Sequence, residues 1–214
     1  MTGKADRFFS PQEQEQIRQA VAAAEATTSG EIATMIVDSS DIYREAKVTA
    51  AILLAAMAAL LMAIITRHTT VWSYLPLTMI CYFPAAFLVA RLPQLLQPFI
   101  SRRRCEEAVR SRSVRAFYEK GLYRTKDETG ILIFISLFEH KVWILGDRGI
   151  NARIAPEAWQ QLARELSEGI GSGSACAALC RVIEKCGELL SSHFPGKRDN
   201  PNELSDAIIT ESRD

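Results

Sequence analysis

The sequence carries no excess of either charge, because its 25 lysine and arginine residues balance its 25 aspartate and glutamate residues. Nucleic-acid-binding proteins usually have a strong basic excess, and disordered chains combine a high net charge with few apolar residues. Neither description fits this chain, in which 48% of the residues are hydrophobic. We therefore expect no nucleic-acid partner, and a length of 214 residues corresponds to one or two folded domains.

The sequence also has few histidines and none of the common catalytic motifs. Its three histidines, His68, His140 and His193, are far apart, whereas a metal site or an activated nucleophile needs convergent side chains. Cys176 and Cys180 would share one helix face, but no fourth ligand stands at zinc-site spacing, so we interpret them as small core residues with reduced thiols. No phosphate-binding loop, nucleophile elbow, dinucleotide fingerprint or kinase signature is present.

Charged residues are missing from two long stretches of the chain. Val48 to Thr66 is uncharged over 19 residues and Thr69 to Ala90 over 22 residues, and about 20 apolar residues are enough to cross a bilayer as a helix. Only Arg67 and His68 separate the two stretches. Two fully apolar helices of this length could hardly be buried in a domain of this size, so we predict a transmembrane hairpin within residues 47–100.

Basic residues around the hairpin predict its orientation. Six of them lie just outside the two spans: Arg44, Lys47, Arg91, Arg102, Arg103 and Arg104. Arg67 alone lies in the turn, and lysine and arginine stay on the cytoplasmic side. We therefore expect a multi-pass protein of the plasma (inner) membrane with both termini cytoplasmic and no signal peptide. Arg102, Arg103 and Arg104 are expected to contact anionic lipid headgroups.

The elements next to the hairpin can be predicted from local signals. Ser10-Pro11-Gln12-Glu13 is a capping box with proline at the first helical position, and Ser29-Gly30 predicts a left-handed stop for that helix. Glu31 to Val37 is rich in β-branched residues and predicts a strand. After the hairpin, residues 101–120 predict a basic amphipathic helix with Arg112 on its apolar face.

The rest of the chain predicts two strands followed by two helices. Ile131 to Phe138 is apolar without alternation, as in a strand buried on both faces, and Lys141 to Asp147 is its return strand. Helices begin at Pro156 and near Ser174. The order predicts an α/β fold (α/β/α), a small mixed sheet flanked by helices, in which Glu31–Val37 runs parallel to Ile131–Phe138. The predicted division is one soluble domain at residues 1–46 and 101–194, the hairpin at 47–100 and a polar tail at 195–214.

Three acidic residues are predicted to meet at one edge of this sheet. Glu31 begins the first strand, Asp127 precedes the second and Asp147 ends the third, so the chain directions bring them together. Three further acidic residues are possible outer members: Glu128, Asp199 and Glu203. Clustered carboxylates favour a hard cation such as calcium. In the alternative, these residues are solvated caps and turn residues, with Asp147 accepting bonds from loop amides and Arg148 or Arg124 supplying the positive charge.

Several segments resemble the TPM domain, a family known from thylakoid-lumen proteins linked to photosystem II repair and from many bacterial membrane proteins. The similar segments, the last two of them resembling a bacterial subgroup, are Ser29–Ile32, Thr129–Ser136, His140–Ile144, Gly146–Ile150, His193–Pro195 and Asn202–Leu204. The resemblance implies an α/β/α fold with a small sheet and an acidic site that holds calcium or a similar ion in some relatives. Weak phosphatase activity has been proposed for the family. Many relatives lie outside the cytoplasm behind a signal peptide, whereas this chain has a hairpin between its first strand and second helix.

Two classes of function fit these features. The first is a membrane-anchored binding or assembly and maintenance module for other membrane proteins, with a divalent cation such as calcium as the candidate cofactor. The alternative is a membrane-bound metal-dependent phosphatase or other hydrolase. Metal-assisted hydrolysis needs a fixed metal with an open coordination position, and no recognisable motif supplies one. The first class is therefore favoured, with the lipid bilayer and other membrane proteins as partners.

Overall fold

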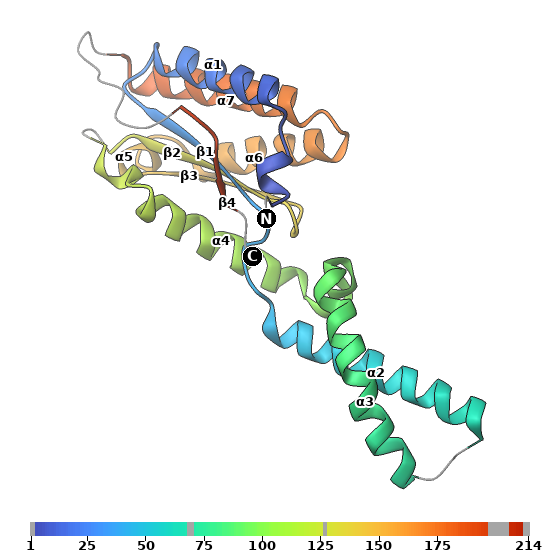
Figure 1. Cartoon of the computed structure of the whole chain (residues 1–214). Coiled ribbons are helices and arrows are strands. Elements are labelled where there is room, and N and C mark those ends of the chain that lie inside the picture. Colours follow the sequence, from blue (N-terminus) through green and yellow to red (C-terminus); the bar gives the residue numbers. More distant parts are fainter. Residues whose placement is uncertain (1–2, 68–70, 126–127, 197–205, 212–214) are drawn as a thin grey trace. The chain divides into compact units, whose positions relative to one another are not determined.

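The chain forms two compact units (Figure 1). The computed structural model describes four stretches of the chain: residues 3–67, 71–125, 128–196 and 206–211. The first unit comprises residues 1–41 and 106–214, and the second is Ile42–Cys105. The second unit contains the stretch predicted as a hairpin, so the chain of the first unit is interrupted by it.

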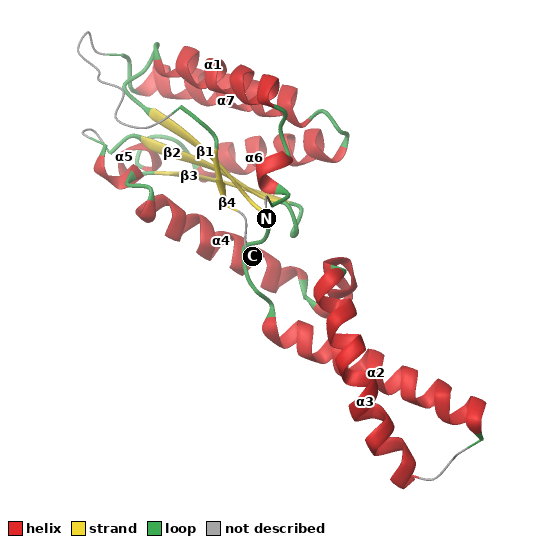
Figure 2. Ribbon diagram, in the orientation of Figure 1, coloured by secondary structure: helices red, strands yellow, loops and turns green. Residues whose placement is uncertain are grey.

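The first unit contains both helices and strands, and Figure 2 colours them by type. Its elements, with α4 beginning just before the unit boundary, are η1 (Ala5–Arg7), α1 (Pro11–Glu25), β1 (Glu31–Val37), α4 (Arg102–Glu119), η3 (Leu122–Arg124), β2 (Gly130–Ser136), β3 (Lys141–Gly146), α5 (Arg148–Asn151), α6 (Pro156–Gly171), α7 (Ala175–His193) and β4 (Ile209–Glu211). Those of the second unit are α2 (Arg44–Thr66), α3 (Val71–Arg91) and η2 (Pro93–Phe99).

The described strands form one mixed sheet in the order β3-β2-β1-β4. β1 runs parallel to β2, with Glu31 opposite Gly130, and β3 runs antiparallel to β2, with Lys141 opposite Ser136. The predicted parallel pairing and the predicted return strand are both confirmed. The turn between β2 and β3 contains His140 at a positive φ of 51°.

Helices cover both faces of the sheet (Figure 1). Ile32 of β1 and Ile133 of β2 belong to a cluster that α1, α6 and α7 complete. Met35 of β1 and Phe134 of β2 point to the opposite face, where they pack with Phe117 of α4. Every residue of β1 and β2 is buried, which explains why their sequences show no polar alternation. The mixed α/β sheet flanked by helices is thus as predicted.

The start of α1 is as predicted, but its end is not. The Glu13 amide donates to Ser10 Oγ at 3.3 Å, and the Ser10 amide donates to Glu13 Oε2 at 2.8 Å, which completes the capping box. The helix ends at Glu25 with a right-handed residue after it, and Gly30 does not have a positive φ, so the predicted left-handed stop is wrong. Gly30 meets a packing requirement instead, because a Cβ there would lie 2.8 Å from Leu190 Cδ1 of α7.

The segment at residues 195–214 is more than the expected polar tail. Its start is tied to the domain, since the Gly196 amide donates to the Thr27 carbonyl at 3.2 Å. Further on, β4 pairs in parallel with Met35–Val37 of β1. A strand of three residues has no sequence pattern of its own, and it forms here because the edge of β1 offers backbone partners.

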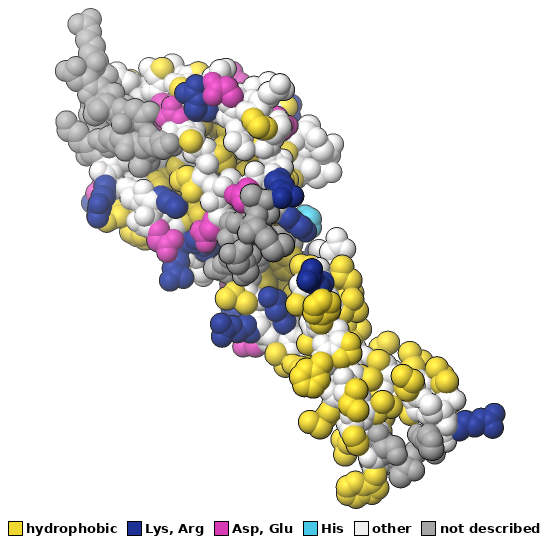
Figure 3. Space-filling view, in the orientation of Figure 1, with side chains coloured by type: hydrophobic (Ala, Val, Ile, Leu, Met, Phe, Trp, Pro, Cys, Tyr) yellow, Lys and Arg dark blue, Asp and Glu magenta, His cyan; other side chains and the backbone are white. Residues whose placement is uncertain are grey.

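The second unit consists mainly of two long helices that pack against each other. Ala51, Ala55 and Ala59 of α2 recur every four residues and are buried, so a stripe of small side chains lets the helices approach. Tyr74 Oη of α3 also donates to the Ala56 carbonyl of α2 at 3.0 Å. Both helices are long and apolar enough to cross a membrane. Figure 3 shows hydrophobic side chains over most of the visible face of this unit.

Candidate functional site

The structure brings Glu31 and Asp147 to the same edge of the sheet, the one at which β1 begins and β3 ends. Glu31 lies opposite Gly130 in the β1–β2 pair, and the Asp147 amide donates to the Gly130 carbonyl at 2.9 Å. The start of β1 and the end of β3 therefore flank the start of β2, as the chain directions predict. Because neighbouring strands are about 4.8 Å apart, the two backbones are separated by about 10 Å. Asp127, the third predicted member, lies outside the described residues.

Asp147 has a clear local role at this edge. It is the N-cap of α5, where its Oδ1 accepts a hydrogen bond from the Arg148 amide at 2.7 Å. Its Oδ2 is buried and has no hydrogen-bond partner among the residues that the structure describes. Arg148 forms an ion pair with Glu128 at 3.2 Å, and Arg124 lies over the ring of Tyr123. The sequence analysis gave this capping role as the alternative to a cation site.

Two further carboxylates lie near Glu31, and the sequence analysis missed both. Glu31 is only 2% exposed, and Glu25 Oε1 accepts a hydrogen bond from the Ile32 amide at 2.7 Å. Burial, followed by the nearby carboxylates of Glu31 and Asp206, raises the pKa of Glu25 to about 8 against the effect of this hydrogen bond. Glu25 is therefore largely protonated at neutral pH.

Glu25 could have been identified in the sequence, whereas Asp206 could not. Glu25 is four residues after the buried Val21, so it continues the apolar stripe of α1 and approaches the sheet. Asp206 reaches this edge only because β4 pairs with β1. Among the described residues, no three His, Cys, Asp or Glu side chains form a group that could hold a metal ion. The possible outer members Asp199 and Glu203 lie outside the described residues.

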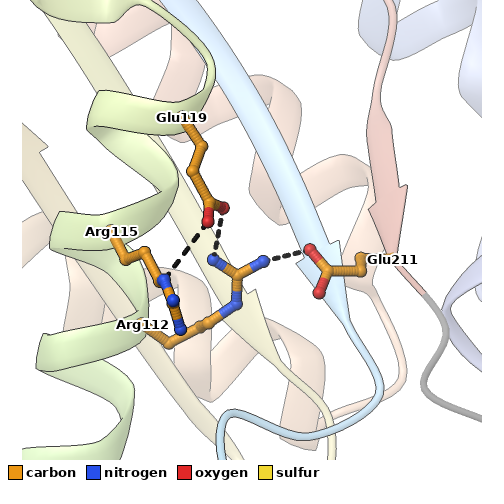
Figure 4. Close-up of polar contacts among 4 residues, drawn as sticks. All are labelled: Arg112, Arg115, Glu119 and Glu211. Carbon is orange, nitrogen blue, oxygen red and sulfur yellow. Dashed lines mark hydrogen bonds and ion pairs between the residues drawn. The ribbon is translucent and has the colours of Figure 1, made fainter.

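The arginines of α4 fall into two groups. Arg102, Arg103 and Arg104 are exposed at the start of the helix. Arg112 instead lies on the buried face, as predicted, and is only 7% exposed. Its guanidinium donates through Nη1 to Glu119 Oε2 at 2.9 Å and through Nη2 to the Glu211 carboxylate of β4 (Figure 4).

A second polar network lies at the carboxyl ends of β1 and β2. Ser40 Oγ donates to Ser136 Oγ at 2.8 Å, and Ser136 Oγ donates to a Glu139 carboxylate oxygen. The Ser40 amide donates to Glu139 Oε1 at 3.0 Å. All three side chains are buried, and the network holds the chain where it leaves β1.

Comparison with known proteins gives one similar structure. No family model matches the chain, and no curated protein matches it. The NMR structure of the BA42 protein from the psychrophilic bacterium Bizionia argentinensis is similar with a TM-score of 0.61, over 95% of this chain and 96% of that chain, at 20% sequence identity. A likeness at this identity concerns the fold alone.

Proposed function

We propose that this protein is a membrane-anchored binding module, whose α2–α3 hairpin crosses the plasma membrane and whose α/β domain binds other membrane proteins from the cytoplasmic side. The observation that carries the membrane anchor in this proposal is the exposure of apolar side chains on α2 and α3. Only 22% of the residues in the α2 span and 11% in the α3 span are buried, whereas a core helix of a soluble protein is mostly buried. Large exposed side chains on the two helices include Leu61, Ile65, Met79 and Phe83.

The hairpin's internal packing supports this proposal. The alanine stripe of α2 and the hydrogen bond from Tyr74 to Ala56 bring one side of each helix into contact with the other helix. The apolar remainder would cost several kcal/mol in water, at roughly 25 cal/mol per Å² of apolar surface, and a bilayer removes that cost. Arg91 at the end of α3 and Arg102, Arg103 and Arg104 of α4 favour the cytoplasmic side and anionic headgroups.

The resemblance to TPM domains supports an α/β domain that acts beside a membrane. Within this proposal the domain is a bacterial-type TPM domain with an inserted hairpin, and it assembles or maintains membrane proteins. The acidic edge at Glu31 and Asp147 then has a structural role or holds a cation such as calcium that stabilises the domain.

Photocrosslinking in native membranes tests the binding function. A photoreactive residue in place of the exposed Tyr118 of α4 should give discrete adducts with membrane proteins, and one in place of Leu61 of α2 should give adducts with lipid. Lipid adducts at position 61 without any protein adduct at position 118 or at other exposed positions of the α/β domain would retain the anchor and reject the binding module.

The hydrolase alternative can be distinguished by calcium titration. It requires a metal held by carboxylates, so calorimetry of the purified protein should show calcium binding that Asp147→Asn removes. Phosphate release with calcium, magnesium or manganese should disappear in the same variant. The binding module requires neither result, and both together would favour the hydrolase.

A further inference from the structure

The outer edge of β1 holds the chain's own β4 as a short parallel strand. Met35, Ile36 and Val37 pair with Ile209, Thr210 and Glu211. The Asp38 amide extends the pairing by donating to the Glu211 carbonyl at 3.2 Å. β4 thus pairs with only three of the seven residues of β1.

Side chains of β4 and of the residue before it enter both faces of the domain. Ile208 packs against the cluster of α1, α6 and α7, and Ile209 packs against the cluster under α4. Thr210 is exposed, and Glu211 reaches Arg112 of α4. η1 also lies against β4. β4 therefore lies at the edge of β1 with η1 beside it and Arg112 of α4 within reach, and a strand added to a sheet edge is recognised through its alternate side chains.

Arg112 gives this edge of β1 a charge preference. The guanidinium is nearly fully buried, and Glu119 and Glu211 supply its two carboxylates (Figure 4). Glu119 belongs to the same helix and stays in place, whereas Glu211 comes from β4. Arg112 is buried while a strand occupies this edge, and a buried guanidinium is stabilised by its carboxylate partners, so a replacing segment with an acidic residue at the position of Glu211 is favoured.

β4 has a short pairing with β1 and a connection of twelve residues to Gly196, which is bonded to Thr27. Twelve residues can span up to about 40 Å, so the connection does not prevent the strand from leaving the edge. Because β4 is tethered to the domain, its effective concentration at the edge of β1 is in the millimolar range. A competing segment should therefore bind much more tightly when β4 is absent.

We propose that the edge of β1, with Arg112, is a binding site for an extended acidic segment of a partner protein, and that β4 occupies this site in the free chain. The segment adds a parallel strand, with an apolar residue at the position of Ile209 and a carboxylate two residues later at that of Glu211. The proposal rests on the binding function proposed above and names the surface and the chemistry of the partner.

Peptide binding to the full chain and to a truncated chain tests the site. The probe is a fluorescent peptide, Asp-Ala-Ile-Ile-Thr-Glu, with the sequence of residues 206–211, and fluorescence anisotropy measures its binding to protein in detergent. A variant that lacks residues 206–214 should bind at least roughly tenfold more tightly than the full chain, because the tethered competitor is gone. A peptide with glutamine in place of its glutamate should lose most of this binding.

Two arginine variants of the truncated chain provide the matched comparison. Arg112→Gln should abolish the gain in binding, whereas Arg115→Gln should keep it, because Arg115 is 71% exposed and pairs only at the surface with Glu119. Equal binding by the full and truncated chains, or equal binding by Arg112→Gln and Arg115→Gln, would overturn the proposal.

A variant of the full chain covers the case in which truncation unfolds the domain. Glu211→Gln keeps the strand and removes its carboxylate, so it should bind the peptide several-fold more tightly than the unaltered chain, and no gain would contradict the proposal. The outcomes also separate the two proposals. Protein adducts at position 118 without peptide binding would reject the binding site at the edge of β1 alone, and peptide binding without protein adducts would reject the membrane-protein partner.

Discussion

Glu25 shows how burial changes the chemistry of a single side chain in this domain. It ends α1 beside the buried Glu31, and the Ile32 amide is its hydrogen-bond donor. The hydrogen bond alone would favour the carboxylate, but burial and the charges of Glu31 and Asp206 oppose it and raise the pKa to about 8. Removal from water therefore has the larger effect at this position.

The raised pKa of Glu25 predicts a pH-dependent stability. The pKa is about 4.5 in the unfolded chain and about 8 in the folded protein, so the folded state holds a proton that the unfolded state releases. The contribution of the protonated Glu25 to the free energy of unfolding is fully present below pH 4.5 and is lost as the pH rises through 8. We expect a loss of roughly 2 kcal/mol across this window, a value discounted for the partial exposure of the side chain. Thermal unfolding followed by tryptophan fluorescence between pH 4.5 and 9 measures it.

Two variants of α1 separate this effect from the general pH dependence. Glu25→Gln keeps an oxygen for the Ile32 amide and carries no titrating proton, so it should flatten the decline. Glu15→Gln is the control, because Arg18 and Gln19 lower the pKa of Glu15 to about 2 and it does not titrate in this range. An unchanged slope in Glu25→Gln would show that another group causes the decline.

At the scale of helices and strands, local sequence signals were sufficient to predict those elements whose hydrogen bonds join residues close in sequence. The capping box of α1 and the β2–β3 hairpin involve residues close in sequence, and both form as predicted. The requirement for glycine at position 30 depends instead on its approach to Leu190 of α7, and β4 depends on the edge of β1. Contacts between distant parts of the chain leave no local pattern, so these two features could not be predicted.

The approach of α6 to α7 gives a prediction about helix packing. A Cβ on Gly169 would lie 2.2 Å from Ala178 Cβ of α7, so Gly169→Ala must push the helices apart and should destabilise the domain by about 2 kcal/mol. No described heavy atom lies within 4 Å of a Cβ on Gly171, two residues later. Gly171→Ala should therefore be neutral or stabilise by up to about 1 kcal/mol. Denaturant unfolding of both variants is the measurement, and equal effects would contradict the packing argument.

At the scale of the whole molecule, the two units differ in what their sequences reveal. The uncharged runs identify the helices of the second unit because only composition and length are needed. In the first unit, chain direction correctly places Glu31 and Asp147 at one edge, since strand polarity follows from the order of elements. It cannot identify Glu25 or Asp206 as their neighbours, because those approaches depend on how α1 and β4 pack.

The orientation of the hairpin in the membrane is a prediction about the topology of the whole chain. Because basic residues flank the spans and Arg67, the C-cap of α2, is the basic residue between them, we expect position 67 outside the plasma membrane and the α/β domain in the cytoplasm. Single cysteines at positions 67 and 148 test this in a background whose four partly exposed native cysteines are replaced by alanine, with the buried Cys186 retained. Arg148 is 87% exposed, so a thiol there is accessible to reagents.

An impermeant maleimide added to intact cells should label the cysteine at position 67 and spare that at position 148, which should react only after permeabilisation. A chain with neither cysteine controls for residual labelling of Cys186. Labelling of position 148 in intact cells would place the α/β domain outside, where Arg102, Arg103 and Arg104 would lie on the side that basic residues avoid. Labelling of both positions in intact cells would mean that the α2–α3 pair does not divide the chain between two compartments, and the membrane-anchored module would then be rejected along with its orientation.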